Sequence, residues 1–271
     1  MTALRVYRVL AAARARDLCL GSPFLVLLLA QQAALFFLQR SALASLESNG
    51  LMVALHPAEY GLLAAVVLLS AFTAVYAAAG PARERASGSL ETLFYGPVSP
   101  AAYVLAEMTA VAAAGCLSLS LLVAALAIGR AAVAYDVPLA LIALLPLCLG
   151  QLLAVAAAGI CGALAFRHER TATAVAVLLL LLSLAAFAGD LFLTQYESAA
   201  SFFVVFLRSL LSTFNRVFRF VFPLGLFLDD LVRYESYGAV PALHVVWYPL
   251  YAAAFALAAI GALRRRGVSV R

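Results

Sequence analysis

Long apolar stretches separated by short polar ones dominate the hydrophobic pattern of this chain. A helix needs roughly 20 predominantly apolar residues to cross the hydrocarbon core of a bilayer. Six windows of the sequence meet that requirement, at about residues 23–39, 60–80, 103–128, 138–166, 171–189 and 240–263. The pattern therefore predicts an all-α membrane protein, with six transmembrane helices in a single domain over residues 1–271.

Glycine–proline steps mark where helices are expected to stop. Proline lacks a backbone N–H and restricts the residue before it. Gly80-Pro81 is therefore expected to end the second helix, and Gly96-Pro97 to end the element that follows it. Pro146 and Gly150 are expected to tilt or kink the long fourth helix.

A short amphipathic helix is predicted between these two Gly-Pro steps, over about residues 86–96. Leu90, Leu93 and Phe94 recur there at i, i+3 and i+4, which places three apolar groups on one face. Such a helix in the polar loop 81–101 is either a handle for a partner protein or an ordinary connector.

Residues 1–20 have the pattern of a modest amphipathic helix. Arginines share one arc and apolar side chains the other; the arginines are Arg5, Arg8 and Arg16, and the apolar residues are Val6, Tyr7, Leu10 and Leu18. Arg14 interrupts this pattern. The segment is predicted to be either an interfacial helix among anionic head groups or a basic flank that only orients the first span.

Residues 190–239 form a predicted external loop that is unusually rich in phenylalanine. Arg208, Arg216 and Arg219 cut its central part into uncharged runs too short to cross a bilayer. We therefore expect a re-entrant or interfacial segment before the last span, in which residues 199–228 enter the membrane partway and return. The alternative is a phenylalanine-rich cap that packs on the helix bundle.

Composition agrees with a membrane protein and narrows its chemistry. Hydrophobic residues make up 66% of the chain and charged residues 11%, whereas soluble domains are about half apolar. Every basic residue is an arginine, which excludes a P-loop and a Schiff-base enzyme because both need lysine. The cysteines form no Cys-x-x-Cys pair and stand apart from the histidines, so buried thiols are expected and no metal site is indicated.

The distribution of arginine predicts the topology. We place both termini, residues 81–101 and residues 167–170 on one side of the membrane. That side then carries Arg5, Arg8, Arg14, Arg16, Arg83, Arg85, Arg167, Arg170, Arg264, Arg265, Arg266 and Arg271, and the short loops opposite carry Arg40 and Arg130. The arginine-rich side is cytoplasmic by the positive-inside rule. The net charge of +5 therefore reflects membrane topology, and we do not expect nucleic acid as a partner.

Polar side chains inside the apolar windows are candidates for function, since they are costly in hydrocarbon. Gln31 and Gln32 stand in the middle of the first window. Neighbouring side chains on a helix point about 100° apart, so at least one of these amides is expected to meet a helix or a cavity, and the pair is a candidate for the transport pathway. Glu107 begins the third span, where we expect it beside Arg83 or Arg85.

The polar loop between the second and third windows also resembles a family signature. The matching residues are Arg83-Glu84-Arg85, Ser87-Gly88-Ser89-Leu90-Glu91, Leu93, Pro97-Val98-Ser99, Tyr103 and Leu105. They resemble the segment E-R-E-x-G-T-L-E-x-L-L-x-x-P-V-S-x-x-x-Y-x-L-G-K of ABC-2 type transporter permeases. The sequence departs from the family at Ala106-Glu107, where the family usually has Gly-Lys.

The resemblance implies the membrane subunit of an ATP-binding cassette exporter in the cell membrane. In that family the segment is a coupling helix that sits in a cleft of a separate ATPase subunit, which binds ATP and Mg²⁺. The implied coupling residues are Arg83, Glu84, Arg85, Leu90, Glu91, Leu93 and Phe94. The apolar members are expected to be buried in the complex and exposed without it. The permease, a homodimer or pseudo-symmetric dimer, is expected to have no catalytic residue, metal or cofactor of its own.

A second class of function fits the same residues. A non-transporting membrane scaffold or assembly factor could use this coupling device to transmit an ATPase-driven conformational change. An intramembrane enzyme is not favoured, because the sequence has no His-Glu-x-x-His and no Gly-x-Ser-x-Gly motif.

Overall fold

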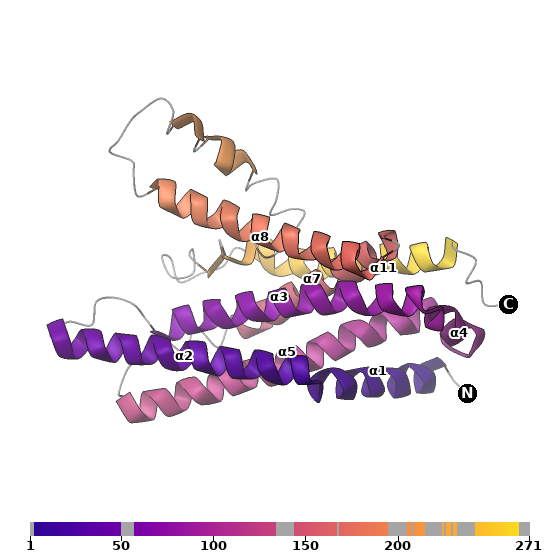
Figure 1. Cartoon of the computed structure of the whole chain (residues 1–271), viewed down its shortest axis with the longest axis horizontal. Helices are drawn as coiled ribbons and strands as arrows, with labels where there is room; N and C mark the ends of the chain where they lie inside the picture. Colours follow the sequence, from indigo (N-terminus) through magenta and orange to yellow (C-terminus); the bar gives the residue numbers. More distant parts are fainter. Residues whose placement is uncertain are drawn as a thin grey trace.

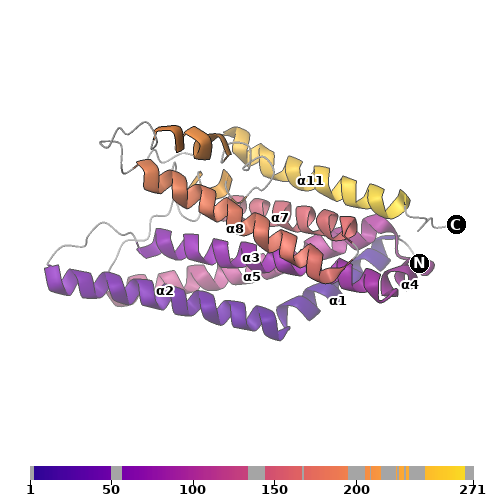
Figure 2. The same ribbon diagram turned by 45° about the horizontal axis from the view of Figure 1, so that its top comes forward.

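The computed structural model of the chain is a helical bundle (Figures 1 and 2). It describes residues 3–49, 57–133, 144–166, 168–194, 205–207, 209–214, 224, 226–228, 230–231 and 242–265. The helices are α1 (Ala3–Cys19), α2 (Ser22–Asn49), α3 (Pro57–Ala86), α4 (Ser89–Tyr95), α5 (Pro100–Val133), α7 (Leu145–Ala165), α8 (Glu169–Thr194) and α11 (Ala242–Arg265). No strand occurs in the part of the chain that the structure describes.

Six of these helices, α2, α3, α5, α7, α8 and α11, are long and apolar enough to cross a membrane, which confirms the predicted number. They lie roughly along one long axis, and the start of α1, the end of α11 and the short helix α4 all lie at the same end of the bundle (Figures 1 and 2). The chain therefore has the fold of a multi-pass α-helical membrane protein. We call the end that holds α4 the inner end.

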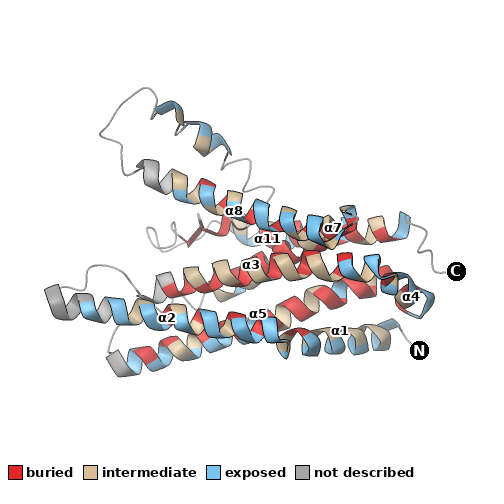
Figure 3. Ribbon diagram, viewed as in Figure 1, coloured by how far each residue is buried: buried red, intermediate tan, exposed pale blue. Residues whose placement is uncertain are grey.

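Helix α7 forms the centre of the bundle. It is the most buried of the six long apolar helices, and it packs against α11, α3, α5 and α8. In contrast, few residues of α2 and α8 are buried in the bundle, and Figure 3 shows blue, exposed faces on both helices. An apolar outer surface is expected where lipid is the solvent.

Small residues let α3 and α7 approach closely. A Cβ placed on Gly159 of α7 would lie only 2.8 Å from the Cβ of Ala77 on α3. Neighbouring alanines of α7, among them Ala156 and Ala157, are fully buried. The small-residue stretch in the fourth span therefore serves close packing, as is usual between membrane helices.

Two predicted proline effects are wrong. Pro81 does not end the second span, because α3 continues through it to Ala86. The flanking Ala78 and Ala82 are buried in a core shared with α7 and α8, so tertiary packing holds the turn despite the missing N–H. Pro146 does not kink the fourth helix either, since it lies in the first turn of α7, where its missing N–H has no intrahelical partner to lose.

Helix α1 packs lengthwise against α5 (Figure 1). The predicted arginine arc is confirmed, because Arg5, Arg8 and Arg16 are all exposed. The opposite face carries the buried Ala11 and Leu18, and Tyr7 shares a 2.7 Å hydrogen bond with Thr109 of α5. This face is therefore covered by protein.

The loop from 190 to 239 is described only in part, and Arg208, Arg216 and Arg219 lie outside the described residues. Helix α8 extends into it as far as Thr194. Leu224 and residues 226–228 are buried in the bundle, where Leu224 and Leu228 join the core between α3, α7 and α8. This part of the loop is thus packed among the spans.

Candidate functional site

The candidate site is the segment that resembles the ABC-2 signature, running from the end of α3 through α4 into α5 at the inner end of the bundle. The predicted short helix exists as α4, one residue after Gly88. Gly88 has φ 74°, a left-handed conformation that glycine adopts without steric cost. Gly96 ends α4 with its N–H donating to the Leu93 carbonyl, so the Gly96-Pro97 step stops this helix as predicted.

Serine side chains fasten the turn between α3 and α4. The hydroxyls of Ser87 and Ser89 each donate to the Glu84 carbonyl, at 3.1 Å in both cases. Thr92 donates to the Gly88 carbonyl at 3.2 Å. These local bonds satisfy backbone groups at the junction of the two helices.

The apolar face of α4 is buried in the chain itself, which contradicts the expectation that it is exposed without a partner. Leu90 is 4% exposed and Phe94 is 5% exposed. Both belong to a core that includes Leu18 of α1, and the Phe94 ring packs edge-on against Tyr103 of α5, with ring centroids 5.8 Å apart. Leu93 is half-buried. The periodicity identified the apolar face correctly, but it could not indicate that this chain covers it.

The opposite face of α4 is open. Glu91, Thr92 and Pro97 are exposed, and Tyr95 is 91% exposed. Tyrosine is among the residue types enriched at the energetic centres of protein interfaces. A partner protein that binds α4 would contact this exposed face.

Arg83 reaches α8. Its Nε and Nη2 donate to the two carboxylate oxygens of Glu169, at 3.2 and 2.6 Å. This two-pronged pair joins the end of α3 to the first turn of α8. Since the Arg83 side chain is 72% exposed, the pair adds little to stability, and its main effect is to fix the end of α3 relative to α8.

Glu84 points the other way, into a partly buried charge cluster with α1 and α5. Its carboxylate pairs with the Arg14 guanidinium and accepts a 2.8 Å hydrogen bond from the Tyr103 hydroxyl. Arg14 Nε also lies 3.1 Å from Glu107 Oε1, and Tyr76 of α3 donates to Glu107 Oε2 at 3.2 Å. One guanidinium thus bridges two carboxylates from different helices.

Arg14 is held charged by this cluster. Burial works against its charge, but the carboxylates of Glu107 and Glu84 outweigh burial and raise the pKa of Arg14 above its usual value. The guanidinium also lies over the Tyr103 ring, 5.7 Å from its centroid. Since only 4% of Glu107 is exposed, its charge depends on this pairing.

Arg85 binds the end of α7. Its Nη1 donates to the carbonyls of Leu164 and Phe166, at 3.1 and 3.0 Å. These carbonyls lie where α7 stops and have no following turn to accept from. The Arg-Glu-Arg triplet therefore ties three neighbouring positions of α3 to α8, to α1 with α5, and to α7.

Sequence reasoning missed Arg14 and misplaced Glu107. We expected Glu107 beside Arg83 or Arg85, but it pairs with Arg14. The signal was present: Arg14 is the basic residue that breaks the apolar arc of the first helix, and Glu107 is an acidic residue inside an apolar window. Two opposite charges, each costly where it stands, form a natural pair.

The two glutamines of the first span have different environments. Gln31 is 2% exposed; its Nε2 donates to the Ala65 carbonyl at 3.0 Å, and its Oε1 accepts from Ser118 at 2.6 Å. It therefore joins α2 to α3 and α5, as expected for an amide that meets helices. Gln32 is half-buried, and its Nε2 has no hydrogen-bond partner among the residues that the structure describes. The structure does not bring either residue to the α4 segment.

A second polar cluster, absent from the sequence predictions, lies before and within α11. Asp230 is fully buried, with Oδ1 2.5 Å from His244 Nδ1 and Oδ2 accepting from the Tyr248 hydroxyl at 2.9 Å. His244 and Tyr248 are one helical turn apart, a spacing that puts them on one face. The cluster joins Asp230 to α11.

No metal site emerges from the described residues, which contain no group of three or more histidine, cysteine, aspartate or glutamate side chains placed to hold an ion. Comparison with known protein families, with curated proteins and with solved structures finds no match for this chain. The fold and the site together define a multi-pass helical membrane protein. Its inner end carries a short helix, α4, and the charged triplet just before it ties the end of α3 to four other helices.

Proposed function

We propose that the chain is the permease subunit of an ABC-2-like exporter, driven by a separate ATPase that docks on α4 at a cytoplasmic inner end. The observation that carries the proposal is the arrangement of the signature-like segment. Its short helix stands between two long apolar helices and exposes Tyr95, while the preceding triplet fastens its base to the bundle.

The contacts support a mechanism of force transmission. When ATP closes the ATPase dimer, each α4 moves with the subunit that holds it. Arg83, Glu84 and Arg85 pass this movement to α8, to α1 with α5, and to α7. The bundle then tilts, and the pathway between two permease copies changes its access. ATP and Mg²⁺ are bound by the partner, and this chain transmits the movement of α4 to its transmembrane helices.

The revised docking surface is the open face of α4, with Tyr95 at its centre and Glu91 and Thr92 beside it. On the opposite side of α4, Leu90 and Phe94 pack into the core and hold the helix in place. The Arg-Glu-Arg triplet keeps its place among the coupling residues as the link to the bundle. Its charges are engaged within the chain, so it is not the main contact with the ATPase.

The test is co-purification of the chain with its ATPase in mild detergent, with the ATPase rate measured alongside. Tyr95→Asp removes a large anchor and places a charge in the contact. Since burial of one large apolar side chain contributes about 1.5–3 kcal/mol, we expect retention of the ATPase to fall at least about tenfold. Tyr95→Phe is the matched control and should retain the partner.

Normal retention and normal coupled ATPase activity in Tyr95→Asp would contradict docking on α4. The scaffold alternative predicts the same loss of the ATPase in this variant. A transport assay in proteoliposomes separates the two functions, because only the exporter moves cargo when ATP is hydrolysed.

A further inference from the structure

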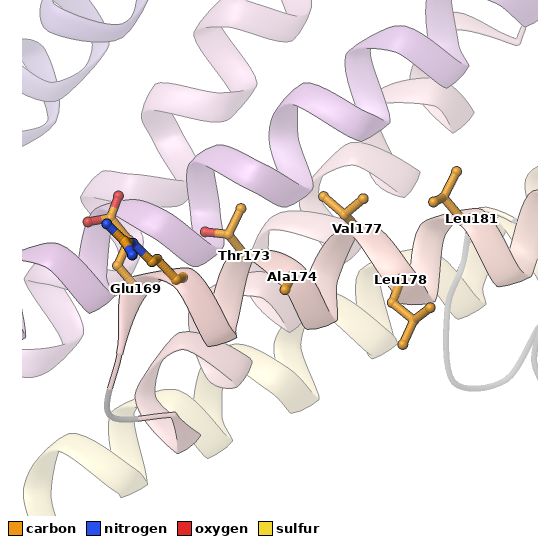
Figure 4. A pocket seen from close by; sticks show the side chains of 7 residues that line it. Glu169, Thr173, Ala174, Val177, Leu178 and Leu181 are labelled. Atoms are coloured by element: carbon orange, nitrogen blue, oxygen red, sulfur yellow. The ribbon is translucent and has the colours of Figure 1, made fainter.

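An open groove of about 620 Å³ runs along the outer face of α8, beginning at the inner end of the bundle. The lining near the start of α8 is polar and consists of Glu169, Arg170 and Thr173. Further along α8 the lining is apolar. Figure 4 shows Thr173, Val177 and Leu181 along one edge of the helix and Leu178 on the other, with the small Ala174 between them.

The polar end of the groove has an excess of positive charge. The Glu169 carboxylate is engaged by Arg83, through the bonds of 3.2 and 2.6 Å described above. Arg170 is exposed and makes no ion pair with any residue that the structure describes. Two guanidinium groups therefore stand beside one carboxylate, an arrangement that favours an anion.

The apolar part of the groove has the length of one membrane leaflet. From Arg170 to Leu181 the helix rises about 16 Å at roughly 1.5 Å per residue, close to half of the roughly 30 Å hydrocarbon core. Helix α8 is itself a candidate span, and few of its residues are buried in the bundle. A molecule with an anionic head and an acyl chain matches both the charge and the length.

The geometry points to a binding site for an anionic phospholipid on α8: the phosphate lies at Arg170, with the Thr173 hydroxyl as a further donor, and one acyl chain lies over Ala174 between Val177 and Leu178. The lipid belongs to the leaflet at the inner end, which is the leaflet rich in anionic lipid if this end is cytoplasmic. The site adjoins the Arg83–Glu169 pair, and it does not depend on the proposed transport function.

The experiment is native mass spectrometry of the full chain released from nanodiscs that contain equal amounts of phosphatidylglycerol and phosphatidylcholine with the same acyl chains. We expect retained lipid to favour phosphatidylglycerol by roughly fivefold, the contribution of one arginine near an anionic surface. Arg170→Gln should reduce this preference to about one. Arg40→Gln is the matched control, an exposed arginine towards the far end of α2 that should keep the preference.

The acyl-chain part is tested by Ala174→Phe, which fills the groove and should reduce retention of both lipids without changing the headgroup preference of what remains. Equal retention of the two lipids by the wild-type chain would overturn the proposal, as would an Arg170→Gln variant that behaves like Arg40→Gln. A change of oligomeric state in Ala174→Phe with unchanged lipid retention would also overturn it, because the groove would then hold a second copy of the chain.

Discussion

Arg14 Nε lies 3.1 Å from Glu107 Oε1, so the N-terminal helix α1 is joined to α5 by an ion pair that is largely shielded from water. Glu84 completes this cluster from the end of α3. A residue that looks like a defect in an amphipathic pattern is therefore a main link between α1 and the rest of the bundle.

Removal of Arg14 should destabilise the protein strongly. Arg14→Ala leaves the carboxylates of Glu107 and Glu84 without their common cation, and breaking a buried pair in this way costs about 3 kcal/mol or more. The measurement is the unfolding free energy in detergent. Arg16→Ala, on the exposed arc of the same helix, should change it by less than about 0.5 kcal/mol. Equal effects of the two variants would show that the cluster contributes nothing to stability.

Phe94 and Tyr95 should separate stability from docking. Phe94→Ala empties a buried site beside Tyr103 and should lower the unfolding free energy by about 3–5 kcal/mol. Tyr95→Ala removes an exposed ring and should change it by no more than about 0.5 kcal/mol. Both are read from thermal or denaturant unfolding of the purified chain without any partner. If Phe94→Ala left the unfolding free energy unchanged, the apolar face of α4 would again be a candidate surface for binding another protein.

Two glycines of α7 provide a matched pair for helix packing. In Gly159→Ala the new methyl group would lie 2.8 Å from the Cβ of Ala77, whereas no atom of the described part of the chain lies within 4 Å of a Cβ at Gly162. Gly159→Ala should therefore be less stable than Gly162→Ala by about 1–3 kcal/mol, the usual cost of overpacking. Unfolding of the two variants under the same conditions gives the difference directly, and a value near zero would mean that α3 and α7 separate without penalty.

The topology is tested with single cysteines in a chain whose four native cysteines have been replaced. Ser87→Cys lies in the exposed turn before α4, and Ser48→Cys lies near the far end of α2. A membrane-impermeant maleimide should label the first only from the cytoplasm and the second only from outside. Labelling of both from one side would rule out the predicted arrangement of spans.

The six long apolar helices were predictable because the hydrocarbon core imposes one length and one composition on every span. Helix α4 was also predictable, since Gly96-Pro97 and the spacing of Leu90, Leu93 and Phe94 are local features. What covers this apolar face is not local. The pattern is the same whether the covering surface is a partner or Tyr103 of the same chain.

The charged residues show the same limit from another side. Arg83, Glu84 and Arg85 were candidates for contact with a partner, yet each makes its described bonds within the chain. Adjacent side chains of a helix point about 100° apart, so three consecutive charged side chains point in three different directions. The identity of what lies in each direction, such as Arg14 or Glu169, is set by the tertiary fold.

The bonds from Arg85 to the Leu164 and Phe166 carbonyls constrain how the molecule can change shape. If α3 slid along α7, two acceptors would lose their donor near the membrane, at a cost of about 1–3 kcal/mol each if they stayed dry. Arg83 joins the same end of α3 to the first turn of α8, but it does so through an exposed ion pair with Glu169, which is a weaker restraint. The inner ends of α3 and α7 are therefore expected to move together, with α8 held more loosely, and bending is expected further along these helices.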